Sequence, residues 1–202
     1  MRYLFKYASY VFHPVWMSFL GTLCYFILTP RYFLREIIEA KLLAITIITI
    51  FIPLVFFFLL KNLGKVSSFS LNKVKERKLP LLASCLLNYM VLQQVFDQYN
   101  YPEAYLFFEG ILISSSIALV ASIFKIKISL HMMGLSGLSC FLLGIGHYFD
   151  LNMVLPIAFL LVIIGLTASS RMYFKAHNKI ELMLGILCGG LPQSLLFFLV
   201  IN

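Results

Sequence analysis

The segment SSRMYFKAHNKIE, residues 169–181, gathers residue types that handle phosphate in a chain that is otherwise largely apolar. A neutral imidazole such as that of His177 is a nucleophile, and a carboxylate such as Glu181 fixes its tautomer by accepting a hydrogen bond from the other ring nitrogen. Arg171 carries a planar fork of donors that suits phosphate oxygens. On one continuous helix Ser170, His177 and Glu181 share a stripe, because they are spaced i, i+7 and i+11. The segment predicts either half of a phosphate-handling site or an ordinary basic loop at a membrane surface.

A second polar group lies in KIKISLHMMGLSG, residues 125–137, at the start of an apolar stretch. The side chain of His131 is suited to giving or taking a proton near neutral pH. Ser129, together with main-chain N–H groups at a helix start, can bind an anion. The alternative is a structural histidine that is hydrogen-bonded to a neighbouring carbonyl at the membrane interface.

A third group lies in GKVSSFSLNKVKERKLP, residues 64–80. Lys73 and Arg77 are four residues apart, so on a helical turn they point to the same side. Together they can hold a phosphate, the lysine as a point charge and the arginine as a fork. The alternative is a solvated loop that is attracted to anionic headgroups.

Composition indicates that membrane-spanning helices hold these segments. The chain has 202 residues, of which 61% are hydrophobic and 12% charged, with a mean hydropathy of +0.95. Soluble domains are about half apolar and about a quarter charged. A helix needs about 20 mainly apolar residues to cross the hydrocarbon core. The seven stretches that suit this length are Tyr7–Thr29, Leu42–Leu60, Leu79–Phe96, Ala104–Phe124, Leu130–Phe149, Met153–Ser169 and Leu182–Ile201.

We therefore expect one all-α domain over residues 1–202, a polytopic transmembrane helical bundle with six or seven spans. The count is open because Asn88, Gln93 and Gln94 in the third stretch need hydrogen-bond partners inside the bundle. The four cysteines fall inside apolar stretches without the spacing of a metal site. Neither a metal nor a cofactor is expected.

The charges are unevenly distributed over this chain, whose formal net charge is +8. If all seven stretches span, the N-terminus and loops 61–78, 125–129 and 170–181 share one side, which holds most of the 16 basic residues. The three basic loops are then expected to meet on one face of the membrane. The positive-inside rule makes that face cytoplasmic, and we expect an integral multi-pass protein of the cytoplasmic (inner) membrane of a bacterium.

The polar segments resemble the signatures of the type 2 phosphatidic acid phosphatase and haloperoxidase superfamily, and the chain looks like a divergent member. The third signature of that family is Ser-Arg-x5-His-x3-Asp. Ser170, Arg171 and His177 match it, with Glu181 in place of Asp. The resemblance covers a phosphatase-like core of about residues 73–190.

The other two signatures are kept less fully. The second, Pro-Ser-Gly-His, is matched in part by Ser129 and His131. The first, Lys-x6-Arg-Pro, is approximated by Lys73, Arg77 and Pro80, whose spacing differs.

The resemblance implies a metal-independent phosphatase that works through a phosphohistidine intermediate on a lipid phosphate or an isoprenyl diphosphate. It implies that His177 is the nucleophile, that Glu181 orients it, and that His131 protonates the leaving lipid oxygen. The residues that it assigns to phosphate binding are Arg171, Ser129, Arg77, Lys73 and Ser170. The implied partners are membrane lipids and not nucleic acid. Members present the site to the extracytoplasmic side, whereas the basic loops favour the cytoplasm, so the side stays open.

Two other classes of protein fit the same composition. One is a catalytically silent relative, a lipid-phosphate-binding or structural membrane protein that keeps the basic pocket. The other is a small transporter, which the scarcity of ionisable residues at mid-span positions disfavours. Release of phosphate from a lipid distinguishes the phosphatase from both.

Overall fold

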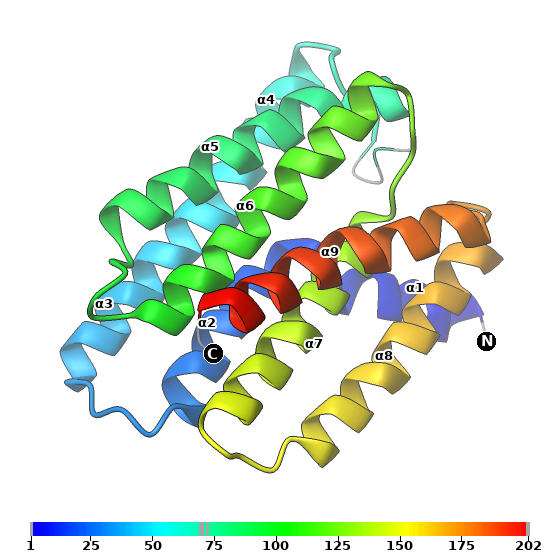
Figure 1. The fold of residues 1–202 in the computed structure, drawn as a ribbon. Helices are drawn as coiled ribbons and strands as arrows, with labels where there is room; N and C mark the ends of the chain where they lie inside the picture. The colour runs from blue at the N-terminus through cyan, green and yellow to red at the C-terminus, as the bar shows by residue number, and fades with distance from the viewer. Residues whose placement is uncertain (1, 69–70, 72, 201–202) are drawn as a thin grey trace.

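The computed structural model describes residues 2–68, 71 and 73–200, and every regular element in these ranges is helical (Figure 1). A helix satisfies its backbone hydrogen bonds internally, as an apolar environment requires. The elements in chain order are α1 (Arg2–Val11), the 3-10 turn η1 (Pro14–Trp16), α2 (Met17–Leu28), α3 (Arg35–Thr46), the π-helical segment η2 (Ile47–Phe51), α4 (Ile52–Asn62), the 3-10 turn η3 (Val74–Arg77), α5 (Lys78–Gln94), α6 (Pro102–Ile123), α7 (Leu130–Tyr148), α8 (Val154–Tyr173) and α9 (Lys179–Val200).

Five helical segments among the described residues are long and apolar enough to cross a membrane. They are Arg35–Asn62, Pro102–Ile123, Leu130–Tyr148, Val154–Tyr173 and Lys179–Leu199. Pro14–Leu28 is a shorter apolar helix, and α5 has 17 residues. The prediction of an all-α fold is confirmed for the described residues, and the long apolar helices support a membrane protein. The count of six or seven spans stays a prediction. Residue 201, where the last expected span ends, lies outside the described residues.

The expected first span, Tyr7–Thr29, is not one helix. α1 ends at Val11, and His13 is extended, with φ −70° and ψ 139°. Pro14 disfavours the helical conformation in the residue before it. His13 Nδ1 instead accepts the Val15 N–H at 3.3 Å and caps the turn that leads into α2. The N-terminal helix is therefore free to take its own direction.

The second expected span, Leu42–Leu60, lies within a longer helical segment that contains a π turn. The Ile52 N–H bonds to Ile47 O, five residues back, immediately before Pro53. Proline cannot donate a hydrogen bond to the preceding turn, and the wider π turn accommodates it without ending the helix.

α7 and α9 approach each other closely. The first turn of α7 carries His131, and the first turn of α9 carries Glu181. A Cβ atom added at Gly189 would lie 2.0 Å from the Met133 carbonyl oxygen. One added at Gly185 would lie 2.5 Å from the Ser129 carbonyl oxygen. Glycine permits this approach of two helix backbones. It brings the first turns of the two helices together, where the Ser129 N–H donates to Glu181 O at 3.1 Å.

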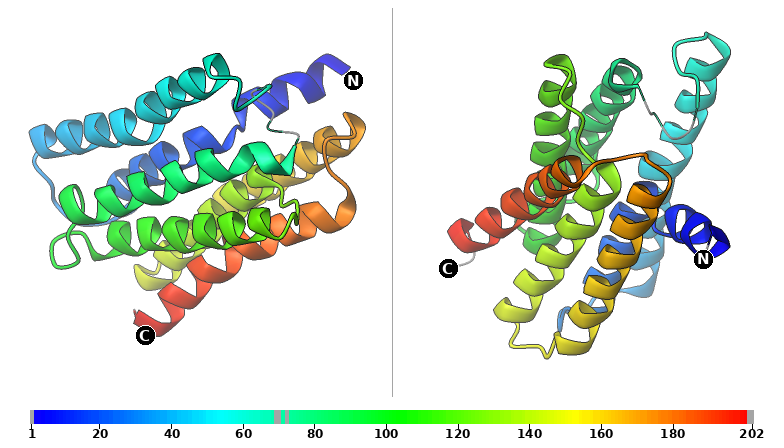
Figure 2. Two further views of the ribbon diagram at one scale, coloured as in Figure 1. Left: turned by 90° about the horizontal axis from the view of Figure 1, so that it is seen from above. Right: turned by 90° about the vertical axis from the view of Figure 1, so that its right-hand side faces the viewer.

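The N-terminus and the three basic loops lie at one end of the bundle, and the α2–α3, α5–α6 and α7–α8 connections lie at the other (Figure 1, Figure 2). Arg77 Nη1 donates to Ile128 O at 2.6 Å, which joins the first basic loop to the second. Lys127 Nζ donates to Ala176 O at 2.6 Å, which joins the second to the third. The predicted meeting of the three loops is confirmed.

Candidate functional site

A tight turn ends α8, and His177 lies in the loop that follows it. Lys175 is left-handed, with φ 51°. Its N–H bonds to Met172 O, and the Ala176 N–H bonds to Arg171 O, both at 2.9 Å. This is the Schellman arrangement that ends many helices, with lysine where glycine is usual. His177 follows two residues later and is buried.

The same turn ends α6 and positions Lys127. Lys125 has φ 62°, and the Ile126 N–H bonds to Ala121 O at 2.8 Å. Lys127 stands two residues after the left-handed lysine, as His177 does in the other loop. Both loops therefore direct a basic side chain inward by the same local geometry.

The stripe of Ser170, His177 and Glu181 requires one continuous helix over residues 170–181, and this condition is not met, because α8 ends at Tyr173 and α9 begins at Lys179. Ser170 and Glu181 therefore lie on different helices and do not form a stripe. The four-residue spacing of the histidine and the acid still produces a contact, but across a helix start.

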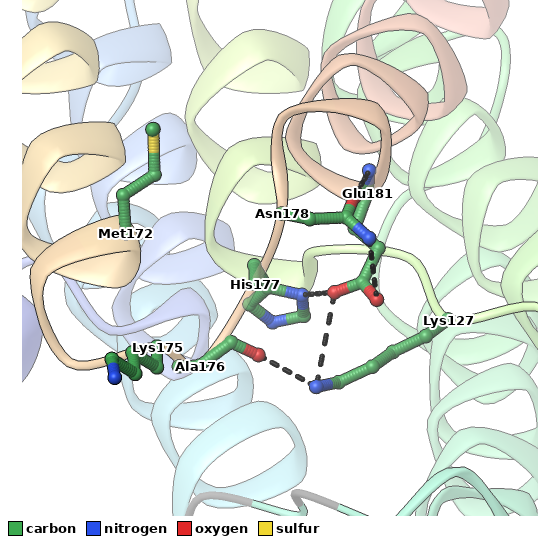
Figure 3. A pocket seen from close by; sticks show the side chains of 7 residues that line it. All are labelled: Lys127, Met172, Lys175, Ala176, His177, Asn178 and Glu181. Carbon is green, nitrogen blue, oxygen red and sulfur yellow. Dashed lines mark hydrogen bonds and ion pairs between the residues drawn. The ribbon is translucent and has the colours of Figure 1, made fainter.

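Glu181 contacts His177 from the first turn of α9. His177 Nδ1 lies 2.6 Å from Glu181 Oε2 (Figure 3). A carboxylate accepts, so Nδ1 carries the hydrogen and Nε2 bears a lone pair. Asn178 caps the helix by accepting the Glu181 N–H at its Oδ1 at 2.9 Å, and its Nδ2 lies 3.4 Å from Glu181 Oε1. The cap holds the carboxylate beside the imidazole.

The surroundings of His177 keep its imidazole neutral. Its side chain is 3% exposed, and burial lowers the pKa of His177. The hydrogen bond to Glu181 opposes this lowering of the pKa, and the charges of Arg77 and Lys127 reinforce it. A neutral imidazole with an unprotonated Nε2 is the form that attacks an electrophile such as phosphorus.

Lys127 is a member of the cluster that the sequence does not single out. Its Nζ lies 3.8 Å from Glu181 Oε2 and donates to Ala176 O, so it holds the histidine loop against the carboxylate (Figure 3). The sequence counts it only as part of a basic loop. Its place two residues before Ser129 was the available signal.

Arg171 and Ser129 have buried polar atoms without a hydrogen-bond partner among the described residues. Arg171 is 8% exposed and its Nε is unpartnered, and Ser129 is fully buried with an unpartnered Oγ. Leaving a buried polar group unsatisfied costs about 1–3 kcal/mol, and more when it is charged. The Nε of Arg171 and the Oγ of Ser129 can each donate a hydrogen bond, and such donors suit an anionic ligand such as phosphate.

Arg77 is a further buried cation of the cluster. It is 4% exposed, and its Nε donates to Leu71 O at 2.8 Å while its Nη1 donates to Ile128 O. Burial lowers the pKa of Arg77, Glu181 opposes this lowering, and the charge of Arg171 adds to it. Arginine still keeps its proton at neutral pH. The carbonyls hold a fixed positive charge close to the carboxylate.

His131 reaches the N-terminal helix. Its Nε2 lies 3.1 Å from Ser9 O, and because a carbonyl accepts, Nε2 carries the hydrogen. The His13 ring stands edge-on at 5.1 Å between ring centroids. Burial and the charge of Arg171 lower the pKa of His13 to about 4. His131 also interacts electrostatically with Arg171 and His177, so the imidazoles and the guanidinium belong to one cluster.

Lys73 stands apart from this cluster, and its predicted helical turn with Arg77 is wrong. Lys73 is extended, with φ −84° and ψ 125°, and the following turn is a 3-10 helix. Its side chain is 75% exposed, and its Nζ lies 3.7 Å from Glu76 Oε1. The two residues therefore diverge, one to the surface and one to the interior.

Ser170 also differs from its predicted placement. Its Oγ donates to Phe5 O at 2.7 Å and lies 2.7 Å from Ser9 Oγ. Ser170 is fully buried. The hydroxyl ties α8 to α1, and Arg171 beside it is the member of the pair that stays without a partner at Nε.

An open pocket of ≈ 360 Å³ gives access to His177 and Glu181 (Figure 3). It is lined by Lys127, Met172, Lys175, Ala176, His177, Asn178 and Glu181. Two lysines, an imidazole and a carboxylate therefore face one opening at the basic end of the bundle. Among the described residues no three His, Cys, Asp or Glu side chains are grouped to hold a metal ion.

Comparison of the chain with protein-family models, curated proteins and solved structures found no match. The functional conclusion therefore depends on the geometry and chemistry of the site.

Proposed function

We propose that the chain is a membrane phosphatase that hydrolyses a lipid phosphate or an isoprenyl diphosphate through a phosphohistidine on His177. The observation that carries the proposal is the 2.6 Å contact between His177 and Glu181. The backbone of the His177 loop bonds to Arg171, a buried arginine whose Nε lacks a partner among the described residues. The neutral imidazole of His177 and the cationic side chain of Lys127 line one pocket. The resemblance to the lipid phosphatase signatures agrees with this chemistry. The proposal places the chain in the cytoplasmic membrane of a bacterium, with six or seven spans.

In the first step the Nε2 lone pair of His177 attacks phosphorus. A phosphorus–nitrogen bond forms, the phosphorus–oxygen bond to the lipid breaks, and the lipid oxygen takes a proton. Glu181 stabilises the positive charge that the ring gains at Nδ1. Arg171, Arg77 and Lys127 stabilise the charge on the non-bridging phosphate oxygens.

In the second step water attacks the phosphorus of the phosphohistidine. The phosphorus–nitrogen bond breaks, inorganic phosphate leaves, and His177 regains its lone pair. His131 is the proposed proton carrier: as an imidazolium it gives one proton to the lipid oxygen in the first step and becomes neutral, and it takes one proton from water in the second. Its Nε2 proton lies on Ser9 O, so this transfer requires that hydrogen bond to open.

The second candidate is a lipid-phosphate-binding protein without turnover. The engaged Nε2 of His131 favours it, because a proton held on Ser9 O is not available to a leaving group. Such a protein binds phosphate through Arg171 and Ser129 but forms no covalent intermediate.

The test is release of inorganic phosphate from phosphatidate by the purified protein in detergent with EDTA. We expect turnover by the natural chain, loss of turnover in His177→Ala, and no loss in His147→Ala, a histidine of α7 in a separate groove near Tyr148. Equal rates in the two variants contradict the phosphatase. If the protein binds phosphatidate or an isoprenyl diphosphate but releases inorganic phosphate from neither, the result supports the lipid-phosphate-binding protein.

A further inference from the structure

α1 exposes one stripe of tyrosines. Tyr3, Tyr7 and Tyr10 are 77%, 67% and 65% exposed, and their i, i+4, i+7 spacing places them on one helix face. Val11 extends the stripe and is 58% exposed. A helix of a soluble surface rarely exposes this much aromatic area in one line.

The type of exposed residue separates α1 from the spanning helices. The large hydrophobic side chains that α9 exposes include no tyrosine. Apart from Phe198 they are aliphatic or thioether, as at Met183, Leu191 and Leu195, and such groups suit hydrocarbon. Tyrosine has an apolar ring and a polar hydroxyl, and it concentrates where lipid headgroups meet the acyl chains. α1 lies at the end of the bundle that carries the basic loops (Figure 1, Figure 2). The position of α1 at this end of the bundle and its exposed tyrosines both point to the headgroup layer.

The opposite face of α1 contacts the candidate site. Ser9 supplies its carbonyl to His131 Nε2 and its hydroxyl to Ser170. Phe5 supplies its carbonyl to Ser170, and its ring lies 5.3 Å from that of Tyr173. One short helix therefore has lipid-facing tyrosines on one side and two residues of the site on the other.

We propose that α1 is a membrane-surface helix whose tyrosine face binds the lipid headgroup layer and whose inner face couples that layer to His131. The partner is the lipid surface itself, in which a lipid phosphate has its headgroup at the same depth. A helix whose outer face contacts water usually carries charged or small polar residues on that face, not three tyrosines. The coupling rests on the proposed function, whereas the binding of the lipid surface does not.

Fluorescence tests the lipid-binding face without any turnover. The chain has one tryptophan, Trp16, so Trp16→Phe gives a silent background for a reporter. Tyr7→Trp reports α1, and Lys73→Trp, on a side chain that is 75% exposed in the first basic loop, is the matched control. In vesicles of phosphatidylglycerol and phosphatidylcholine we expect the α1 reporter to be quenched by nitroxide headgroups more strongly than the control and shielded from iodide. Iodide quenching of both reporters to the same extent overturns the proposal.

A kinetic measurement tests the coupling. The triple variant Tyr3→Ser, Tyr7→Ser, Tyr10→Ser should lose phosphate release from long-chain phosphatidate in vesicles and keep it on a water-soluble short-chain phosphate. Equal loss on both substrates, or no loss on either, overturns the coupling. If the natural chain releases phosphate from neither substrate, the proposed phosphatase fails, and the quenching result alone decides whether α1 binds the lipid surface.

Discussion

His177 Nδ1 lies 2.6 Å from Glu181 Oε2, and this contact joins a loop after α8 to the first turn of α9. The carboxylate holds the hydrogen of one ring nitrogen and leaves the other nitrogen free. Arg77 and Lys127 add positive charge to the pair, and Arg171 in turn interacts electrostatically with Arg77. The proposed nucleophile and basic side chains of the three loops are thereby brought together.

Glu181→Gln should lower the rate of phosphate release while the fold stays intact. The amide keeps the size of the side chain but can donate to Nδ1, which favours the tautomer with a protonated, inactive Nε2. Wrong-tautomer substitutions beside a catalytic histidine cost up to about 10⁴-fold in rate. Phosphate release measures the effect, and Glu39→Gln, at an exposed pair with Arg35, is the control. An unchanged rate in Glu181→Gln would remove the orienting role.

Arg171→Met should change stability and ligand binding in opposite directions. Removing a buried cation whose Nε lacks a partner relieves a cost of about 1–3 kcal/mol, so the thermal unfolding temperature without phosphate should rise. Inorganic phosphate should raise the unfolding temperature of the natural chain and not that of the variant. A variant that unfolds at a lower temperature without phosphate would show that Arg171 is already satisfied.

His13 should make the folded protein less stable in acid. Its pKa is about 4, against an ordinary value of 6.5, because of burial and of Arg171. A lowered pKa means that the unfolded chain binds the proton more tightly. The stability from neutral His13 is therefore complete above about pH 6.5 and is lost as the pH falls through about 4.

Unfolding temperature as a function of pH measures this contribution. His13→Asn is the comparison, because asparagine can accept the Val15 N–H and keep the cap without titrating. We expect the difference between the two chains to change between pH 6.5 and 4, and curves that stay parallel over that range would contradict the prediction.

A disulfide between positions 9 and 170 should stop turnover reversibly. The two hydroxyl oxygens lie 2.7 Å apart, so sulfur atoms at these positions are close to the S–S bond length of about 2.0 Å. Ser9→Cys with Ser170→Cys, in a chain whose four cysteines are replaced by alanine, locks α1 onto α8. His131 Nε2 then stays on Ser9 O, so its proton cannot reach the lipid oxygen.

Phosphate release before and after addition of a reductant measures the lock. We expect little release from the oxidised protein and recovery on reduction, with each single-cysteine variant as the control. Full turnover by the oxidised protein would show that α1 does not have to move.

The sequence predicts the helices and the meeting of the basic loops, because both follow from simple spacing. Apolar length identifies the five helices that are long enough to cross a membrane, and two helices between successive basic loops return the chain to the same end of the bundle (Figure 1). The hydrogen bonds of Arg77 and Lys127 confirm this meeting. The four-residue spacing also identifies the His177–Glu181 contact, although not the helix start across which it forms.

The errors arise where a local turn or a distant contact decides the geometry. Lys175 occupies a left-handed position that glycine usually marks, so the end of α8 leaves no signal in the sequence. Ser170 is bound by Phe5 and Ser9, more than 150 residues earlier in the chain, and no spacing rule reports such a partner. His13 breaks the first apolar stretch because Pro14 follows it, a signal that continuous hydropathy hides.

The most direct measurement is the detection of a covalent phosphohistidine. The purified protein is mixed with phosphatidate labelled at its phosphate, quenched within milliseconds to seconds, and digested for mass spectrometry under alkaline conditions that preserve phosphohistidine. We predict an acid-labile phosphoryl group on the peptide that contains His177, absent in His177→Ala. Phosphate release without any phosphoryl group on this peptide, or with the group on another residue, would contradict nucleophilic catalysis by His177.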